Sequence, residues 1–228
     1  DYEPGVVTSE LLRRADTAMY AAKQTRGNLA HYDPMLDEAD EAKQRLVDDL
    51  IHALANDGLS LVYQPLVSVS RRMIVGAEVL LRWDHPQLGR LSPEIVLETA
   101  ERADQVGELN RWIIDNALHE LGTLPLEEDD DFTLAVNASP AELESPELIP
   151  NLRRALEATG LPPHRLIVEL SERIVAAGDD LGEIIEQLME LGIVLSLDDF
   201  GEGKTSLGHL RRLPVRQLKL DRELVRQA

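Results

Sequence analysis

The sequence has no cysteine, few aromatic residues and no long hydrophobic run. Without cysteine the chain has no disulfide, no thiol nucleophile and no thiolate metal site, which permits a cytoplasmic location. Aromatic residues make up 4% of the 228 residues and hydrophobic residues 43%, so the core must be mainly aliphatic. No apolar run approaches the roughly 20 residues of a membrane span, and no signal peptide opens the sequence. We therefore expect a cytoplasmic segment without a membrane contact of its own, although a preceding part of the protein could carry an anchor.

Basic residues are also scarce. The 23 Lys and Arg residues stand against 42 Asp and Glu residues, which gives a formal net charge of −19. Such a surface repels nucleic-acid backbones and anionic membranes, and no basic stripe offsets it. We therefore expect no nucleic-acid polymer as a partner. An anionic ligand would need a local metal or arginine site to overcome the field of the chain.

Two helices are predicted in the N-terminal part of the chain. The first covers residues 9–26 and ends at Gly27, and the second covers residues 35–56 between Pro34 and Gly58. Apolar residues recur at helical spacing in both, so each helix is expected to present one face for packing.

From residue 59 onward the pattern predicts alternating strands and helices. The predicted strands are 59–69, 73–83, 132–136, 165–170, 193–197 and 217–220, the first two forming a hairpin. The predicted helices are 92–121 with a break near Gly107, 146–159, 181–191 and 205–212. Repeated strand–helix units of this length indicate parallel strands buried on both faces, which fits either a barrel or an open sheet.

Residues 193–201 deliver two adjacent carboxylates, Asp198 and Asp199, after a short aliphatic run. This pattern predicts a buried strand with two acids at its carboxyl end. Adjacent aspartates repel each other, so both stay ionised only beside a cation or strong donors, and a divalent metal would satisfy that need. The alternative is a structural Asx turn followed by Gly201.

Polar residues also follow or end four other predicted strands: Glu78, Asn137, Glu169 and Lys219. Acids at one rim of a closed sheet converge on a common point, whereas a flat sheet would spread them out, so this pattern favours a β/α barrel. Carboxylates with one amide form an oxygen-only ligand set, which favours Mg²⁺ or Mn²⁺ over a structural zinc. The sequence therefore predicts a divalent-metal site at one rim.

Six short motifs occur between residues 63 and 222. They are YQP at 63–65, EVLLRW at 78–83, VNAS at 136–139, ELSE at 169–172, DDFG at 198–201 and KLDR at 219–222. In this order they resemble the signature motifs of the EAL family of cyclic di-GMP phosphodiesterases, with Val79 in place of the alanine of E-A-L. One such motif would be a weak signal, whereas six in order are specific.

The resemblance implies a (β/α)8-like TIM barrel that hydrolyses cyclic di-GMP to linear pGpG in bacterial second-messenger signalling, with Mg²⁺ or Mn²⁺ as cofactor. It implies a first metal held by Glu78, Asn137, Glu169 and Asp198, with Asp199 holding or bridging a second. By the same resemblance Lys219 would contact the nucleophilic water, and Gln64, Leu80 and Arg82 would bind the substrate. Glu172 would hold the loop after Asp199, and the domain would form a homodimer.

Residues 11–34 resemble the closing helix and strand of a GGDEF diguanylate cyclase domain. The matching residues are Ala15, Asp16, Tyr20, Ala22, Lys23 and Asn28. The GG-D/E-EF signature itself is absent, so we expect no cyclase activity. We interpret residues 1–33 as the end of a GGDEF domain, 34–56 as a linker helix, and 57–228 as an EAL domain that lacks its last strands.

The sequence departs from the EAL pattern in two places. Glu202 and Lys204 stand where the family commonly has a small residue and an aromatic residue, which is expected to alter the loop at the metal site and dimer contact. After Asp221 there is no counterpart of the family's A-E-G-V-E block with its catalytic glutamate. We therefore expect a piece of a longer GGDEF-EAL protein that is unstable or inactive alone. The alternatives for the parent are a non-catalytic cyclic di-GMP receptor or interaction module, and an unrelated barrel hydrolase using the same acids.

Overall fold

The computed structural model describes residues 7–24, 31–123, 132–172, 174, 181–201 and 214–227. The chain divides into two compact units, Asp1–Leu50 and Ile51–Ala228. The boundary lies inside the long helix α2 (Pro34–Ala55).

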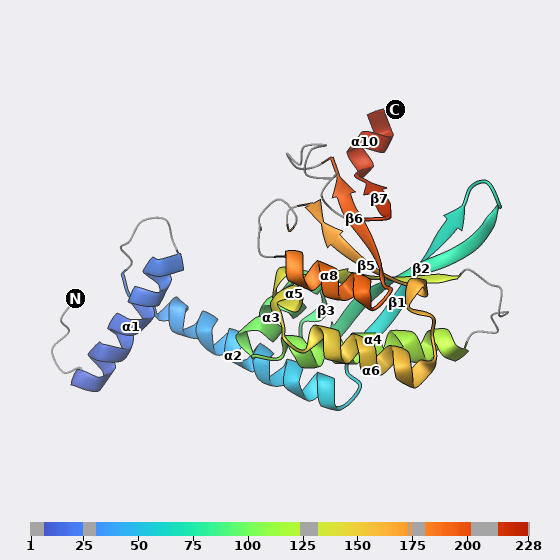
Figure 1. Ribbon diagram of the computed structural model, residues 1–228. Coiled ribbons are helices and arrows are strands. Elements are labelled where there is room, and N and C mark those ends of the chain that lie inside the picture. Colours follow the sequence, from blue (N-terminus) through green and yellow to red (C-terminus); the bar gives the residue numbers. More distant parts are fainter. Residues whose placement is uncertain are drawn as a thin grey trace. The chain divides into compact units, whose positions relative to one another are not determined.

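The first unit consists of helix α1 (Thr8–Gln24) and most of α2 (Figure 1). Asp33 stabilises the start of α2, because its Oδ1 accepts a hydrogen bond of 3.0 Å from a first-turn backbone N–H. The guanidinium of Arg14 on α1 lies 5.0 Å from the centroid of the Tyr32 ring, a cation–π contact. Both predicted N-terminal helices are confirmed, and the predicted end of the first at residue 26 lies outside the described residues.

The second unit opens with the predicted hairpin. Strands β1 (Ser60–Ser68) and β2 (Met73–His85) pair antiparallel, and the turn closes with a 2.8 Å hydrogen bond from Arg72 N to the Ser68 carbonyl. Arg72 has a φ of 53°, the left-handed conformation that tight hairpin turns require. A short strand, β3 (Gly89–Leu91), pairs with the end of β2 and was not predicted.

The sheet continues with four parallel strands, β4 (Thr133–Ala138), β5 (Leu166–Ser171), β6 (Val194–Phe200) and β7 (Gln217–Leu220). The spatial order is β1-β2-β4-β5-β6-β7, so each of these strands lies beside the next one along the chain. A doubly wound sheet would reverse its order at a switch point, whereas a β/α barrel winds in one direction. The second unit is therefore a curled, TIM-barrel-like sheet, which confirms this part of the predicted fold class (Figure 1).

Helices follow most of the strands in the described residues. They are α3 (Pro93–Arg102), α4 (Val106–Thr123), α5 (Pro140–Glu144), α6 (Leu148–Thr159), the 3-10 turn η1 (Pro163–Arg165), α8 (Gly182–Glu190) and α10 (Arg222–Gln227). The main core lies between the outer face of the sheet and α4, α6 and α8, where Leu118, Leu152 and Leu188 are at most 1% exposed. The buried members of this core include no aromatic residue in the described part of the chain, so the predicted aliphatic core is confirmed.

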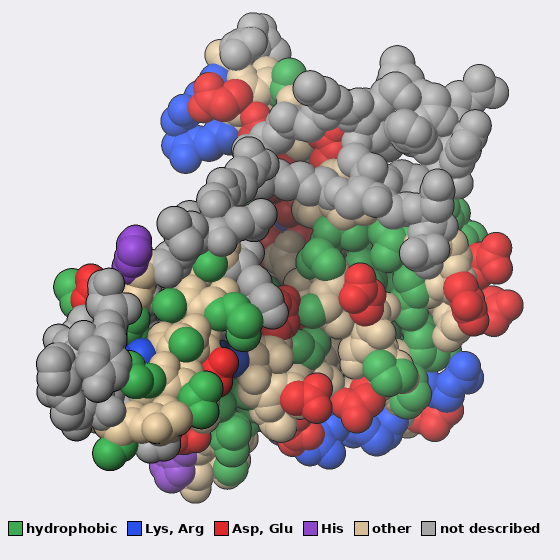
Figure 2. All heavy atoms as spheres, turned by 90° about the vertical axis from the view of Figure 1, so that its left-hand side faces the viewer, with side chains coloured by type: hydrophobic (Ala, Val, Ile, Leu, Met, Phe, Trp, Pro, Cys, Tyr) green, Lys and Arg blue, Asp and Glu red, His purple; other side chains and the backbone are tan. Residues whose placement is uncertain are grey.

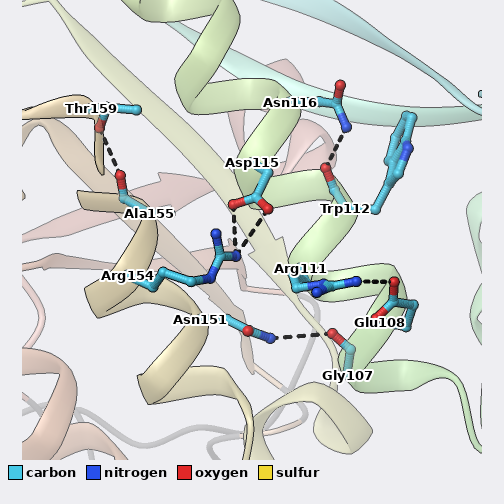
Figure 3. A network of polar contacts seen from close by, with 10 residues as sticks. All are labelled: Gly107, Glu108, Arg111, Trp112, Asp115, Asn116, Asn151, Arg154, Ala155 and Thr159. Carbon is cyan, nitrogen blue, oxygen red and sulfur yellow. Dashed lines mark hydrogen bonds and ion pairs between the residues drawn. The ribbon is translucent and has the colours of Figure 1, made fainter. Parts of the chain in front are cut away.

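Polar contacts join α4 to α6 on the surface of this layer (Figure 3). Arg154 Nη2 lies 2.8 and 2.9 Å from the two carboxylate oxygens of Asp115, and Asn151 Nδ2 donates to the Gly107 carbonyl at 3.2 Å. The Arg154 and Asp115 side chains are 48% and 40% exposed, so this pair contributes little beyond orienting the two helices.

The predicted break near Gly107 is confirmed, and it lies just before the glycine. The chain leaves α3 at residues 103–105, where Asp104 has a φ of 55°, and Gly107 lies in the first turn of α4. A Cβ at Gly107 would lie 1.7 Å from Glu147 Oε2, so the glycine allows a close approach of the chain segment before α6. An aspartate in the left-handed conformation ends α3.

Four short elements, β3, α5, η1 and α10, were not predicted because three to six residues are too few to show a periodicity. Gly160 and Gly192, which directly follow the predicted helices 146–159 and 181–191, have φ values of 67° and 86°. The predicted helix 205–212 lies outside the described residues.

No helix in the described residues combines the length and hydrophobicity that a bilayer span requires. On the face drawn in Figure 2, red Asp and Glu side chains are distributed widely and blue Lys and Arg side chains gather in smaller groups, as the net charge of −19 leads one to expect.

Candidate metal centre

Five neighbouring strands place a polar side chain on the inner face of the curled sheet: Glu78 on β2, Asn137 on β4, Glu169 on β5, Asp198 on β6 and Lys219 on β7. Side chains alternate between the two faces of a strand, so the aliphatic residues next to them fill the outer core. Parallel strands end at the same edge, which brings together residues as far apart in sequence as Glu78 and Lys219.

The Lys219 ammonium lies in the middle of three carboxylates. Its Nζ is 2.9 Å from Glu78 Oε2, 2.6 Å from Glu169 Oε2 and 3.2 Å from Asp198 Oδ2. One oxygen of each acid lies within 4.8 Å of those of the other two. The Glu78, Glu169 and Asp198 side chains are 13%, 2% and 20% exposed, so water screens these charges only in part. We call these four residues the acidic cluster.

Asn137 joins the acidic cluster through Glu78, whose Oε1 accepts a 2.9 Å hydrogen bond from the Asn137 amide. A capping box fixes the chain immediately after Asn137. Ser139 Oγ accepts from the Glu142 backbone N–H at 3.2 Å, and the Glu142 carboxylate accepts from the Ser139 backbone N–H at 2.7 Å. Asn110 on α4 also donates to Glu142, at 3.3 Å. The turn that carries Asn137 is therefore tied to the helical layer.

The carboxyl end of β6 departs from regular strand geometry. Asp199 has a φ of 53°, and the register of β6 on β7 shifts between Leu197 and Phe200. Adjacent strand residues normally point to opposite faces, and this irregularity interrupts the alternation at Asp199. Asp198 Oδ1 accepts the Asp199 backbone N–H at 2.9 Å, while its Oδ2 contacts Lys219. Asp198 therefore bonds to the adjacent backbone with one oxygen and contributes to the acidic cluster with the other.

Glu172 contacts the turn that follows. Its carboxylate, on a residue only 2% exposed, accepts a 2.8 Å hydrogen bond from Gly201 N. Gly201 has a φ of 113°, and a Cβ at this position would lie 2.1 Å from Leu224 Cδ1 on α10. Only glycine accommodates this backbone conformation and this contact without strain.

The charges of the acidic cluster do not balance, since three carboxylates face one ammonium. Burial raises the pKa of Glu169 to about 7, the Lys219 ammonium opposes this rise, and the Glu78 and Asp198 carboxylates add to it. Burial lowers the pKa of Lys219, but the hydrogen bonds to Glu169 and Glu78 outweigh it, so this pKa is raised above its ordinary value. Lys219 is therefore an ammonium at neutral pH, and the Glu169 carboxyl group, with a pKa of about 7, titrates near neutral pH.

The acidic cluster fits a hard divalent cation. Its position is already marked by a positive group, because the Lys219 ammonium contacts all three acids at once. Divalent ions bind oxygen at about 2.0–2.6 Å, so ligands on opposite sides of one ion lie about 4–5 Å apart. The spacing of at most 4.8 Å meets this requirement. Carboxylates with a neighbouring amide favour Mg²⁺, Mn²⁺ or Ca²⁺ and do not distinguish among them.

The three predicted substrate-binding residues lie on the same hairpin as Glu78. Gln64 pairs directly with Glu78 across β1 and β2, and Leu80 and Arg82 follow Glu78 at alternate positions of β2. All three therefore share the inner face with the acidic cluster. Arg82 Nη1 donates to the Leu81 carbonyl at 2.7 Å.

A mainly apolar cavity of about 290 Å³ lies apart from the acidic cluster. Its walls include Ala77 and Leu134 of the outer core, and Tyr63 and Glu120 line it as well. Burial and the hydrogen bond to Glu120 raise the pKa of Tyr63. Because this cavity lies on the outer side of the sheet, it does not extend the candidate metal centre.

The structure thus brings Glu78, Glu169, Asp198 and Lys219 into one cluster, with Asn137 beside it. Among the described acids, Asp199 is not one of the three clustered carboxylates. Sequence analysis missed Ser196, which lies on the same face two residues before Asp198. The altered loop positions Glu202 and Lys204 lie outside the described residues.

Curated relatives match nearly the whole chain. The bifunctional diguanylate cyclase/cyclic di-GMP phosphodiesterase MucR of Pseudomonas aeruginosa is 34% identical over 225 residues, which are 98% of this chain and 33% of that protein. The biofilm architecture maintenance protein MbaA of Vibrio cholerae is 35% identical over 217 residues, 95% of this chain and 27% of that protein. The chain spans between 26% and 33% of the length of the first curated relatives.

A solved structure described as the PaMucR phosphodiesterase in complex with c-di-GMP shares the fold. It superposes with a TM-score of 0.72 at 35% identity and covers 80% of this chain and 74% of its own. The EAL domain family profile matches residues 47–228, which include all the residues of the acidic cluster. This chain therefore belongs to the EAL domain family.

Proposed function

We propose that the protein containing this chain hydrolyses cyclic di-GMP to linear pGpG in second-messenger signalling. The observation that carries the proposal is the meeting of Glu78, Glu169 and Asp198 around one cationic position at a strand rim. Support also comes from the relatives, because MucR is named a cyclic di-GMP phosphodiesterase and the PaMucR structure is a c-di-GMP complex.

EAL domains depend on a divalent metal, and four residues would hold it here: Glu78, Asn137, Glu169 and Asp198. Asp199 would assist in holding a second ion. A divalent ion bound there supplies a hydroxide near neutral pH and stabilises charge that develops on a phosphodiester. Mg²⁺ and Mn²⁺ are the proposed ions, since all the ligand atoms are oxygens.

Lys219 has two roles in this proposal. Without metal its ammonium neutralises part of the charge of the three carboxylates, at 2.6–3.2 Å from them. With a divalent cation held by the carboxylates, the Lys219 ammonium would be available to a nearby water and would favour its deprotonated form.

Substrate binding would rest on the hairpin residues beside the acidic cluster. Arg82 has the planar guanidinium that binds a phosphate in bidentate fashion, which a chain of net charge −19 needs to hold an anionic dinucleotide. Gln64 lies opposite Glu78 and would contact the guanine side of the ligand, with Leu80 on the same face. Glu172 would keep the Asp199 loop in place through Gly201.

We further propose that residues 1–33 are the end of a GGDEF domain, residues 34–56 a linker helix and residues 57–228 an EAL domain without its last strands. The division of the chain inside α2 supports a linker there. On the C-terminal side, β7 pairs with β6 and with no other described strand, and Leu218 and Leu220 are 47% and 57% exposed. A further strand beside β7 would cover them. A homodimer through this domain completes the proposal.

The test is hydrolysis of cyclic di-GMP by the full-length protein with Mg²⁺ or Mn²⁺, followed by chromatography of pGpG. Metal-dependent turnover supports the phosphodiesterase. Tight binding without turnover would replace it with the receptor function.

Glu78→Ala sharpens the test. Removing one of the four proposed ligands is expected to abolish metal-dependent hydrolysis, whereas Glu101→Ala, which changes an exposed acid on α3, should leave the rate unchanged. Equal rates for Glu78→Ala and the wild type would remove Glu78 from the metal centre.

A further inference from the structure

Ser196 carries a buried hydroxyl without a partner. The residue is 0% exposed, and its Oγ has no hydrogen bond in the described part of the chain. Leaving a buried hydroxyl unpaired destabilises the folded state, which an alanine at this position would avoid. The two other buried polar atoms in this state, Asn110 Oδ1 and Trp112 Nε1, are both on α4, outside the sheet. Of these three unpaired polar atoms, the Ser196 hydroxyl is therefore the one that lies near the metal centre, and its lack of a partner needs an explanation.

The place of Ser196 in the sheet connects it to the acidic cluster. Its Cα pairs with Glu169 on β5 and with Gln217 on β7, so these three residues form one row across parallel strands. Neighbouring strands are about 4.8 Å apart, and paired residues point to the same face. Ser196 therefore lies beside Glu169 on the inner face. It is two residues before Asp198 on β6 and points to the same side of the strand.

Glu169 has an oxygen to which this hydroxyl could donate. Its contact with Lys219 is made by Oε2 at 2.6 Å, and no hydrogen bond is made by Oε1 in the described residues. The Asn137 amide, on the strand on the other side of Glu169, is already engaged with Glu78. A serine O–H rotates freely about the Cβ–Oγ bond, so it can reorient without any movement of the backbone.

We propose that Ser196 is a positioning residue for the divalent cation, and this rests on the proposed function of the acidic cluster. When the cation takes the place of the Lys219 ammonium, Glu169 turns one oxygen to the ion, and the Ser196 hydroxyl donates to the other. This bond fixes the rotamer of the most buried ligand of the three. Hydrogen bonds of this kind to metal-binding carboxylates are typically worth 10–100-fold in metal affinity.

Ser196→Ala in the full-length protein tests the proposal through two measurements. The first is the melting temperature with a chelator present, which is expected to stay equal or rise because an unpaired hydroxyl is removed. The second is Mn²⁺ affinity from calorimetry or from the metal-induced rise in melting temperature, which is expected to weaken about tenfold or more. Ser70→Ala, which removes an exposed hydroxyl in the hairpin turn, is the matched control and should change neither.

The outcomes separate this inference from the proposed function. A lower melting temperature with chelator and an unchanged Mn²⁺ affinity would show that Ser196 is structural and overturn the inference, while hydrolysis by the wild type would still stand. Unchanged values in both measurements would overturn it as well. Ser196→Cys, with nearly the same shape and a weak donor, is expected to bind Mn²⁺ as weakly as Ser196→Ala, whereas wild-type affinity in that variant would contradict the role of the hydroxyl. A wild type that binds no Mn²⁺ would overturn both proposals.

Discussion

Lys219→Met removes the single positive charge that the acidic cluster holds without metal. Methionine keeps most of the length of the side chain and its apolar stem, so the change tests the ammonium rather than the packing. Three carboxylates, of which Glu169 is only 2% exposed, would then face one another without a counter-charge. The folded protein must respond by protonating them or by losing stability.

The expected loss is large because the ammonium makes three contacts at 2.6–3.2 Å in a partly buried site. Breaking a buried ion pair by removing one partner typically costs about 3–5 kcal/mol. In a protein of this size each kcal/mol lowers the melting temperature by about 2–4 °C, so with a chelator the variant should melt about 6–20 °C below the wild type.

Mn²⁺ should reverse much of this loss. A ligand present at 100 times its dissociation constant stabilises a protein by about 2.7 kcal/mol, and the variant has no ammonium to compete with the ion. The measurement is a set of thermal melts with EDTA and with increasing Mn²⁺, in which the variant gains more than the wild type. Lys43→Met, at an exposed position of α2, is the control and should change stability by less than about 0.5 kcal/mol. Equal melting temperatures for Lys219→Met and the wild type with EDTA, or equal gains with Mn²⁺, would refute the reasoning.

Two further variants test neighbouring features. With a chelator, Glu169 binds a proton more tightly in the folded chain (pKa about 7) than in the unfolded chain (about 4.5), so its contribution to stability falls as pH rises from about 4.5 to 7, by at most about 3 kcal/mol. Glu169→Gln should remove that slope, and denaturant unfolding that shows the same pH dependence in both proteins would contradict it. Gly201→Ala should cost about 1–3 kcal/mol, because alanine is strained at a φ of 113° and its Cβ meets Leu224. Gly122→Ala on α4, where nothing lies within 4 Å of an added Cβ, is its control, and an equal cost in both would show that Gly201 has no special conformation.

The sequence predicted the strand order and the meeting of the acids for the same reason. Aliphatic runs with glycine stops locate parallel strands, and the ends of such strands share an edge, so Glu78 and Lys219 could be expected to meet although 141 positions separate them. Once the strands are located, the sequence itself gives the residue at the end of each strand. What periodicity could not supply was the short elements β3 and α5.

The details inside the metal centre depended on geometry that no local pattern carries. That the Lys219 ammonium lies between the three carboxylates was not predicted, because the stagger of the strands decides which side chains are at the same height. Its predicted contact with a nucleophilic water stays a prediction. The left-handed conformation of Asp199 follows from a register shift between β6 and β7, and two adjacent aspartates do not signal such a shift. Ser196 was missed because a serine in an aliphatic run looks like a tolerated core residue until its register with Glu169 is known.

The two faces of the sheet divide stability from function. The outer face is closed by aliphatic residues of α4, α6 and α8, and it holds the main core of the described residues. The inner face presents acids, amides and one ammonium. Its three clustered carboxylates lower the stability of the fold unless a cation compensates their charge. Leu118→Ala on the outer face should therefore lower the free energy of unfolding by about 2–5 kcal/mol whether or not metal is present. Changes on the inner face should instead alter stability in a metal-dependent way, since there the ion and the ammonium compensate the same charge.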